Sequence, residues 1–114
     1  MTDRLRIAFA QMNQRVGDLE GNAAGILAMR RKAAAVGADL LVPPELQLVG
    51  YPPEDLVLKP AFQAACRAAV EALARESAKG PALLVGTPWV EDGKLYNAYA
   101  HLAGGAIAAP ARCA

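Results

Sequence analysis

The sequence predicts an α/β fold in which a mixed β-sheet carries two long helices on one face. Short apolar segments of strand length alternate with two longer segments whose apolar residues recur at helical spacing. Further strand-like segments joined by glycine-containing turns follow. Successive strand–helix–strand units are right-handed, so they place both helices on the same face, and the hairpins add antiparallel strands.

The first strand–helix pair spans the first 37 residues. A strand is predicted at residues 5–11, where Ile7 and Phe9 favour extended structure. Asp18 suits the N-cap of a helix, and Glu20 suits its positive end. The residues expected on the buried face of this helix are Ile26, Met29, Ala33 and Val36. Gly37 is expected to end the helix.

A second strand, at residues 38–42, leads into a proline-rich segment and a second helix. The strand ends at Pro43 because proline fixes its own φ and restricts the residue before it. Pro60 suits a first helical position, and Gly80-Pro81 ends the helical pattern. The expected buried face consists of Phe62, Cys66, Ala69 and Leu73.

The last third of the chain predicts strands and tight turns. Pro88 is expected to end the third strand, and Pro110 to interrupt the fifth. Glu91-Asp92-Gly93 and Gly104-Gly105 supply the turns. The strands are predicted at residues 82–87, 95–103 and 106–109.

The composition argues against several classes of protein. The formal net charge is +1, and the largest basic cluster is Arg30-Arg31-Lys32, so neither a nucleic-acid surface nor an anionic membrane surface is indicated. The apolar runs are shorter than the roughly 20 residues that span a bilayer. The two cysteines, Cys66 and Cys113, are too few for a disulfide framework, and the start of the chain has no secretory pattern. We therefore expect a soluble cytoplasmic chain without a metal site.

A carboxylate stands directly after the second predicted strand. The pair Pro43-Pro44 stiffens the chain there and displays Glu45 on a non-repetitive stretch. Such a position suits an acid used in chemistry, although an exposed loop acid is the ordinary fate of a glutamate.

Several motifs, in order along the chain, together resemble the carbon–nitrogen hydrolase (nitrilase) superfamily. The segment Gly50-Tyr-Pro-Pro-Glu-Asp-Leu56 further resembles the glutaminase domain of glutamine-dependent NAD+ synthetases. The resemblance implies a four-layer α-β-β-α sandwich, with residues 1–109 forming an incomplete domain, roughly its first half, and residues 110–114 a tail outside the family pattern. The motifs are residues 7–13, Val16-Gly-Asp18 with Asn22, Pro44-Glu45, Gly50-Tyr51, Gly86-Thr-Pro88 and Leu95-Tyr-Asn-Ala98.

The resemblance also implies a Glu–Lys–Cys triad that hydrolyses an amide. In such enzymes a cysteine thiolate attacks the side-chain carbonyl of glutamine, a lysine stabilises the oxyanion, and a glutamate is the general base and acid. Glu45 matches that glutamate. Tyr51 is a candidate wall of the substrate pocket, and a packing role for it is equally open.

The other two members of the triad have no match in these residues. In the family the lysine follows the strand that begins here near Ala106, but this chain runs Ala109-Pro-Ala-Arg-Cys-Ala114. Cys66 is expected to be a small buried hydrophobe and Lys94 a solvated turn residue. We therefore predict an enzyme fragment that is inactive alone.

The resemblance assigns the remaining chemistry to other parts of a larger protein. Ammonia released from glutamine would pass to a synthetase domain that uses ATP and Mg2+ to amidate deamido-NAD, and no cofactor is expected in this segment. The intact protein is expected to be a homo-oligomer. Two alternatives stay open: a piece of a stand-alone amidase, or a non-catalytic half-domain that acts through a partner chain.

Overall fold

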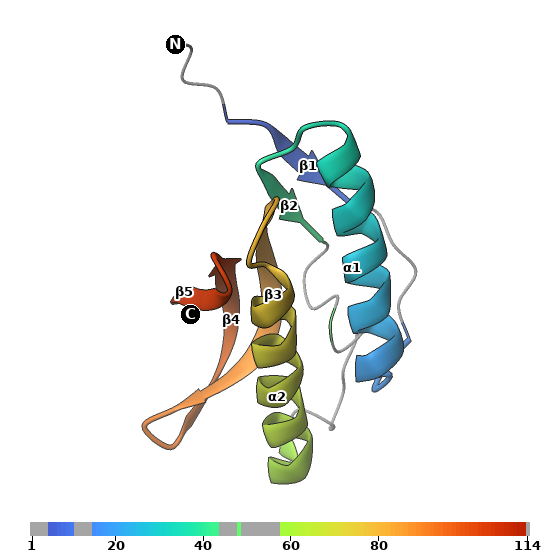
Figure 1. Cartoon of the computed structure of the whole chain (residues 1–114). Helices are drawn as coiled ribbons and strands as arrows, with labels where there is room; N and C mark the ends of the chain where they lie inside the picture. The colour runs from blue at the N-terminus through green and yellow to red at the C-terminus, as the bar shows by residue number, and fades with distance from the viewer. Residues whose placement is uncertain (1–4, 11–14, 44–47, 49–57, 114) are drawn as a thin grey trace.

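A five-stranded mixed sheet with two helices in front of it forms the fold (Figure 1). The computed structural model describes residues 5–10, 15–43, 48 and 58–113. The predicted fold class is confirmed. In chain order the elements are β1 (Ile7–Phe9), α1 (Leu19–Ala35), β2 (Leu40–Val42), α2 (Pro60–Glu76), β3 (Ala82–Glu91), β4 (Lys94–Ala103) and β5 (Ala106–Cys113).

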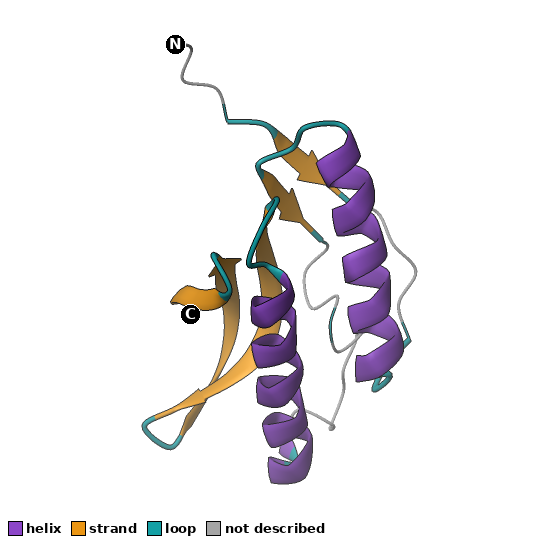
Figure 2. Ribbon diagram, viewed as in Figure 1, coloured by secondary structure: helices purple, strands orange, loops and turns teal. Residues whose placement is uncertain are grey.

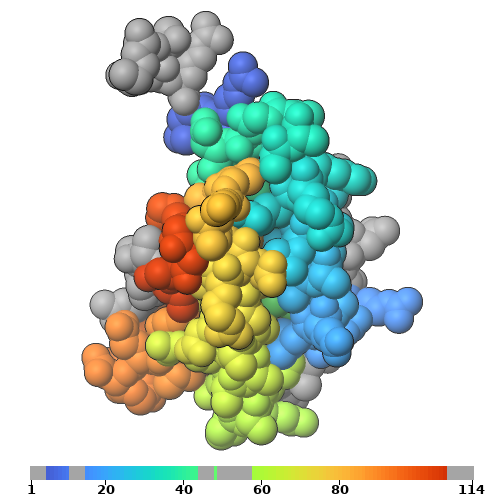
Figure 3. Space-filling model, viewed as in Figure 1, coloured from blue at the N-terminus to red at the C-terminus, as the bar shows by residue number. Residues whose placement is uncertain are grey.

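The strands lie in the sheet in the same order as in the sequence. Strands β1, β2 and β3 are parallel, and Leu40 pairs with both Ile7 and Ala82. Strands β4 and β5 continue the sheet as antiparallel hairpins. Both crossovers step across the sheet in one direction, so α1 and α2 cover the same face and lie side by side (Figures 2 and 3).

Helix α1 begins and ends where its local signals predict. The Asp18 carboxylate accepts a hydrogen bond from the Gly21 N–H at 3.0 Å, and Gly37 follows the helix with a φ of +77°. Ile26 is fully buried, as expected, but Val36 is 69% exposed. The prediction for Val36 is wrong because this residue is the C-cap, with a ψ of 9°, and no longer follows the helical face.

Helix α2 begins at Pro60, as predicted, and ends at Glu76, before the Gly80-Pro81 pair. The C-cap is Ser77, whose buried hydroxyl donates to the Ala74 carbonyl at 2.6 Å. The buried residues of the helix are Cys66, Val70, Leu73 and Ala74.

The prediction that Pro88 ends the third strand is wrong, because β3 runs through it to Glu91. Strand β2 pairs with β3 only at Ala82 and Leu83, so at Pro88 the described partner strand is β4 alone. Proline is tolerated where one side of a strand needs no ladder hydrogen bond.

The expected interruption at Pro110 is wrong for the same reason. Strand β5 pairs with β4 and lies at the edge of the sheet, so its outer side has no ladder to maintain among the described strands. Pro110 stands opposite Ala100, and the strand continues to Cys113. In contrast, β1 and β2 have three residues each and are shorter than predicted.

The two faces of the sheet differ in burial. The helix-covered face carries apolar side chains that are at most 5% exposed: Leu41, Leu83, Val85, Trp89, Ala100 and Leu102. The opposite face exposes large apolar side chains: Ile7 (44%), Phe9 (78%), Val90 (39%) and Leu95 (38%). No described helix has the length and apolar character needed to cross a membrane.

Candidate functional site

The carboxyl ends of the parallel strands β1 and β2 lie along one edge of the sheet. A parallel α/β fold usually presents its functional loops at this edge of strand ends. The Ala10 N–H donates to the Val42 carbonyl at 3.0 Å and extends the ladder one residue beyond β1. Pro43 is buried directly after β2. The chain segments that follow β1 and β2 therefore start next to one another.

The predicted base, Glu45, stands three residues after Val42 in the sequence and lies outside the described residues. Tyr51, the candidate wall of the substrate pocket, also lies outside them. Both assignments stay predictions. The structure does describe a position on each side of Glu45: Pro43 before it and Leu48 after it, and the Leu48 side chain is fully buried.

Asn22 joins the two segments at this edge. Its side chain is in the first turns of α1 and is only 4% exposed. The Nδ2 amide donates to the Leu48 carbonyl at 2.9 Å and to the Arg15 carbonyl at 2.7 Å. The Oδ1 atom accepts a hydrogen bond from the Arg15 N–H at 3.0 Å.

Asn22 belongs to one of the sequence motifs, but its sequence context alone did not predict a role for it. One signal could have found the role: Asn22 precedes Ile26 by four residues and so falls on the apolar face of α1. A polar residue on a buried helical face needs hydrogen-bond partners. The identity of those partners could not be predicted, since Leu48 is 26 residues away.

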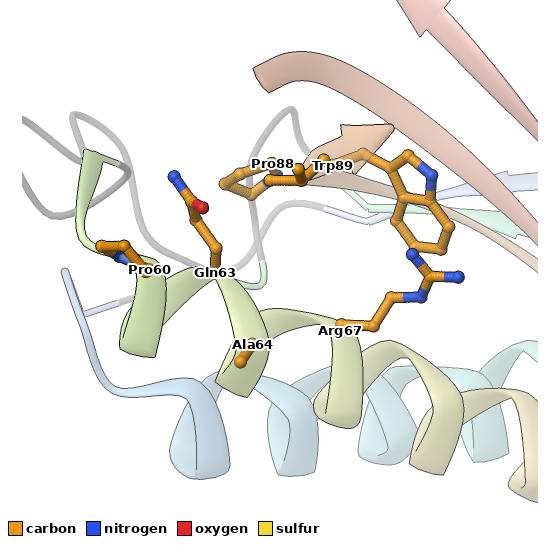
Figure 4. Close-up of a pocket in the computed structure, with 7 residues that line it drawn as sticks. Pro60, Gln63, Ala64, Arg67, Pro88 and Trp89 are labelled. Carbon is orange, nitrogen blue, oxygen red and sulfur yellow. The ribbon is translucent and has the colours of Figure 1, made fainter. Parts of the chain in front are cut away.

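A hollow of about 260 Å³ lies between the first turns of α2 and the end of β3 (Figure 4). The Arg67 guanidinium stacks on the Trp89 ring, 3.9 Å from its centroid, and Arg67 Nε is 3.5 Å from Glu71 Oε1. Among the described residues that line the hollow, none carries a carboxylate, thiol or amine, so these residues supply no acid–nucleophile pair. The residues that line the hollow are Pro60, Gln63, Ala64, Arg67, Pro88, Trp89 and Val90.

Cys66 is fully buried in α2, beside Phe62 and Leu19, which confirms the expectation of a small buried hydrophobe. Desolvation by burial raises the pKa of its thiol to about 11. A catalytic thiol needs a lowered pKa, so Cys66 is unsuited to be a nucleophile. Lys94 is exposed and is the first residue of β4, directly after the β3–β4 turn.

The described residues contain no group of three His, Cys, Asp or Glu side chains that could hold a metal ion. His101, the only histidine of the chain, is exposed on β4. Its neighbour across the ladder is Leu84, an apolar residue.

The carbon–nitrogen hydrolase family profile matches residues 6–109. A glutamine-dependent NAD(+) synthetase from Rhodobacter capsulatus is 47% identical over 111 residues, which cover 97% of this chain and 20% of that protein. A protein of the same name from Xylella fastidiosa is 41% identical over 108 residues, covering 94% of this chain and 20% of its own length. The chain thus spans about a fifth of the length of the curated relatives that it matches.

Solved structures show the same fold. A glutamine-dependent NAD(+) synthetase from Cytophaga hutchinsonii superposes with a TM-score of 0.85 at 26% identity, over 93% of this chain and 18% of that one. An amidase from Nesterenkonia sp. superposes with a TM-score of 0.76 at 25% identity, over 95% of this chain and 42% of that one. The described sheet and its two helices form roughly the first half of a nitrilase-like α-β-β-α sandwich. On the match of sequence and fold, the chain belongs to the carbon–nitrogen hydrolase family.

Proposed function

We propose that this chain supplies the general base of a glutaminase domain that releases ammonia from glutamine for the synthesis of NAD+. The main support for this proposal is the 47% identity over 111 residues with a protein named glutamine-dependent NAD(+) synthetase. The same name accompanies the Xylella protein and the structure from Cytophaga.

In the proposed reaction the Glu45 carboxylate takes the proton of a cysteine thiol, and the sulfur attacks the side-chain carbonyl carbon of glutamine. A lysine stabilises the oxyanion, and ammonia leaves with the proton that Glu45 returns. Water, activated by the same carboxylate, then cleaves the thioester to glutamate. Glu45 is suited to this role because only two residues separate it from the end of β2, whose central residue Leu41 is buried in the core.

The 114 residues on their own are predicted to be inactive. After Lys94 they contain no further lysine, and the thiol of Cys66 is buried with its pKa raised to about 11. The proposed lysine and nucleophile would come from other residues of a longer protein. ATP and Mg2+ would serve the amidation of deamido-NAD in a separate synthetase domain.

A chimera tests the proposal. The matching segment of the Rhodobacter capsulatus synthetase is replaced by residues 6–109 of this chain, and NAD+ formation is measured with glutamine and, separately, with ammonia. We expect both activities in the parent chimera. Glu45→Gln should lower the glutamine-dependent rate by roughly 10³-fold or more, since it removes the base of a covalent mechanism, and leave the ammonia-dependent rate unchanged.

The control variant is Glu76→Gln, which neutralises the last residue of α2 and should leave both rates unchanged. Glutamine-dependent turnover that survives Glu45→Gln would contradict the proposed base. A chimera that uses ammonia but not glutamine would contradict the glutaminase assignment itself.

A second candidate function is that of a stand-alone amidase. It is favoured by the superposition on the Nesterenkonia amidase, at a TM-score of 0.76. The 47% identity with one synthetase over 97% of this chain, and the higher TM-score with the synthetase structure, 0.85 against 0.76, favour the first proposal. The gene sequence beyond these residues distinguishes the two, because only the first proposal needs an ATP-binding synthetase domain.

A further inference from the structure

We propose that Asn22 is a positioning residue for the proposed base Glu45, because it fixes Leu48, three residues further along the chain, against α1. The role of Glu45 in this inference rests on the proposed function. The contact that defines Asn22 does not, since it is a hydrogen bond between described atoms: Asn22 Nδ2 donates to the Leu48 carbonyl at 2.9 Å.

The segment from Val42 to Leu48 is attached to the fold at both ends. At its start, Val42 accepts a hydrogen bond from the Ala10 N–H at 3.0 Å, and Pro43 is buried. At its end, Leu48 is fully buried and its carbonyl is held by Asn22. Four residues, 44–47, separate these two described positions in the sequence, so the chain between them has a short reach. The proposed effect of Asn22 on Glu45 acts through Leu48.

The chemistry of the contact is specific to an asparagine amide. One Nδ2 group donates to carbonyls on two different segments, at Leu48 and at Arg15, while Oδ1 accepts the Arg15 N–H. An aspartate would keep the acceptor and lose both donors. Because the side chain is 4% exposed, water is poorly placed to substitute for the lost donors.

Ser77 provides a matched comparison. Its side chain is 1% exposed and its hydroxyl donates to a backbone carbonyl at 2.6 Å, but that carbonyl belongs to Ala74 of the same helix. Ser77 therefore stabilises a helix end, whereas Asn22 connects a helix to segments that precede and follow it. Loss of either should lower stability, and only loss of Asn22 should affect the segment of Glu45.

The first experiment uses the 114-residue chain and needs no enzyme activity. In the wild-type chain, we expect the Nδ2 protons of Asn22, observed by NMR, to exchange with solvent at least tenfold more slowly than those of an exposed asparagine, because both donate to carbonyls at a buried site. In Asn22→Asp, we expect faster deuterium uptake by backbone amides in residues 45–48 and unchanged uptake in β3. Ser77→Ala should leave uptake in residues 45–48 unchanged.

Fast exchange of the Asn22 amide in the wild-type chain would overturn the proposal without any variant. Uptake in residues 45–48 that is the same in Asn22→Asp and Ser77→Ala would overturn it as well. Neither outcome bears on whether Glu45 is a catalytic base.

The second experiment uses the active chimera. We expect Asn22→Asp to lower kcat with glutamine by about 10- to 100-fold through misplacement of the base, with KM for glutamine and the ammonia-dependent rate unchanged. Ser77→Ala, compared at an equal margin below its own melting temperature, should keep kcat. Equal losses of kcat in the two variants would overturn the positioning role, whereas a parent chimera without glutaminase activity would count against the proposed function alone.

Discussion

At the scale of single residues, burial gives Asn22 and Cys66 different properties. Asn22 has its amide group matched to backbone partners at 2.7–3.0 Å, so its burial produces a specific connection. Cys66 packs against Phe62 and Leu19, and its burial suppresses ionisation. A position in the fold, more than a residue type, decides which side chain can take part in chemistry.

The raised pKa of Cys66 predicts a loss of stability at high pH. In the unfolded chain the thiol ionises near its ordinary pKa of 9.0, whereas in the folded chain it ionises near 11. The unfolded state therefore loses its proton first as the pH rises. The contribution of the neutral thiol is fully present below pH 9 and is lost as the pH rises from 9 through 11.

The measurement is the melting temperature from pH 7 to pH 11 in a Cys113→Ala background, with and without Cys66→Ala. Cys66→Ala should lower stability by about 1–2 kcal/mol at pH 7 through lost packing, and the difference should shrink above pH 9. A difference between the two chains that stays constant up to pH 11 would mean that the thiol ionises normally in the folded state.

Local sequence signals predicted the roles of several individual residues. Hydrogen-bond partners that are distant in the sequence could not be predicted. The Asp18 cap was predictable because its partner, Gly21, is three residues away in the same helix. Glu45 was predicted to be the base from its neighbours in the sequence, and this assignment stays a prediction because Glu45 lies outside the described residues. The hydrogen bond from Asn22 to Leu48 was not predictable because its two residues are 26 positions apart in the sequence and meet only in the folded chain.

At the scale of elements, the helices and turns follow local sequence, and the strand ends do not. Helix α1 stops before Gly37, and the turn at Asp92-Gly93 has the positive φ values, 51° and 75°, that a tight hairpin needs. Strand length depends on which neighbours are available. Pro88 and Pro110 read as strand breakers in isolation, yet each lies where one side of its strand has no described ladder partner.

The β3–β4 turn provides a test of this local control. Gly93→Ala should destabilise the chain by about 1 kcal/mol, because an alanine at a φ of +75° adopts a left-handed conformation. No described atom lies within 4 Å of the added Cβ, so the cost is one of backbone conformation and not of a clash. Thermal or urea unfolding measures it.

Asp92→Asn is the matched control, since asparagine also tolerates the φ of 51° at that position, and its stability should stay within about 0.5 kcal/mol of wild type. A Gly93→Ala chain as stable as wild type would show that the hairpin can adopt another turn at no cost.

At the scale of the whole molecule, the order of strands and helices was sufficient to predict a sheet with one helix-covered face. The rules of crossover handedness and hairpin pairing leave few alternatives for such an order. The order of strands and helices does not predict which members of a catalytic triad a chain contains, because a triad assembled from distant segments has no local pattern. The open face of the sheet belongs to the same scale, since none of the described elements buries its large apolar side chains.

That open face predicts association of the isolated 114-residue chain. Ile7, Phe9, Val90 and Leu95 are 38–78% exposed on the side of the sheet opposite α1 and α2, and an exposed apolar surface of this kind marks an interface. We expect sedimentation velocity to show concentration-dependent self-association, which the double variant Phe9→Ser/Val90→Ser should weaken. Because Phe9 is 78% exposed, its replacement should leave unfolding stability nearly unchanged.

Val36→Ser is the control for the loss of an exposed apolar side chain as such. Val36 is 69% exposed but lies at the end of α1, away from the open face, so its replacement should leave the association unchanged.

A wild-type chain that stays monomeric would show that the open face needs no cover. It would also leave no reason to propose a half-domain that acts through a partner chain. An equal effect of Val36→Ser would place the association on another surface. If only the variant on the sheet face weakens association, the apolar side chains of β1 and β3 form the contact, as expected for one sheet of an α-β-β-α sandwich without its second sheet.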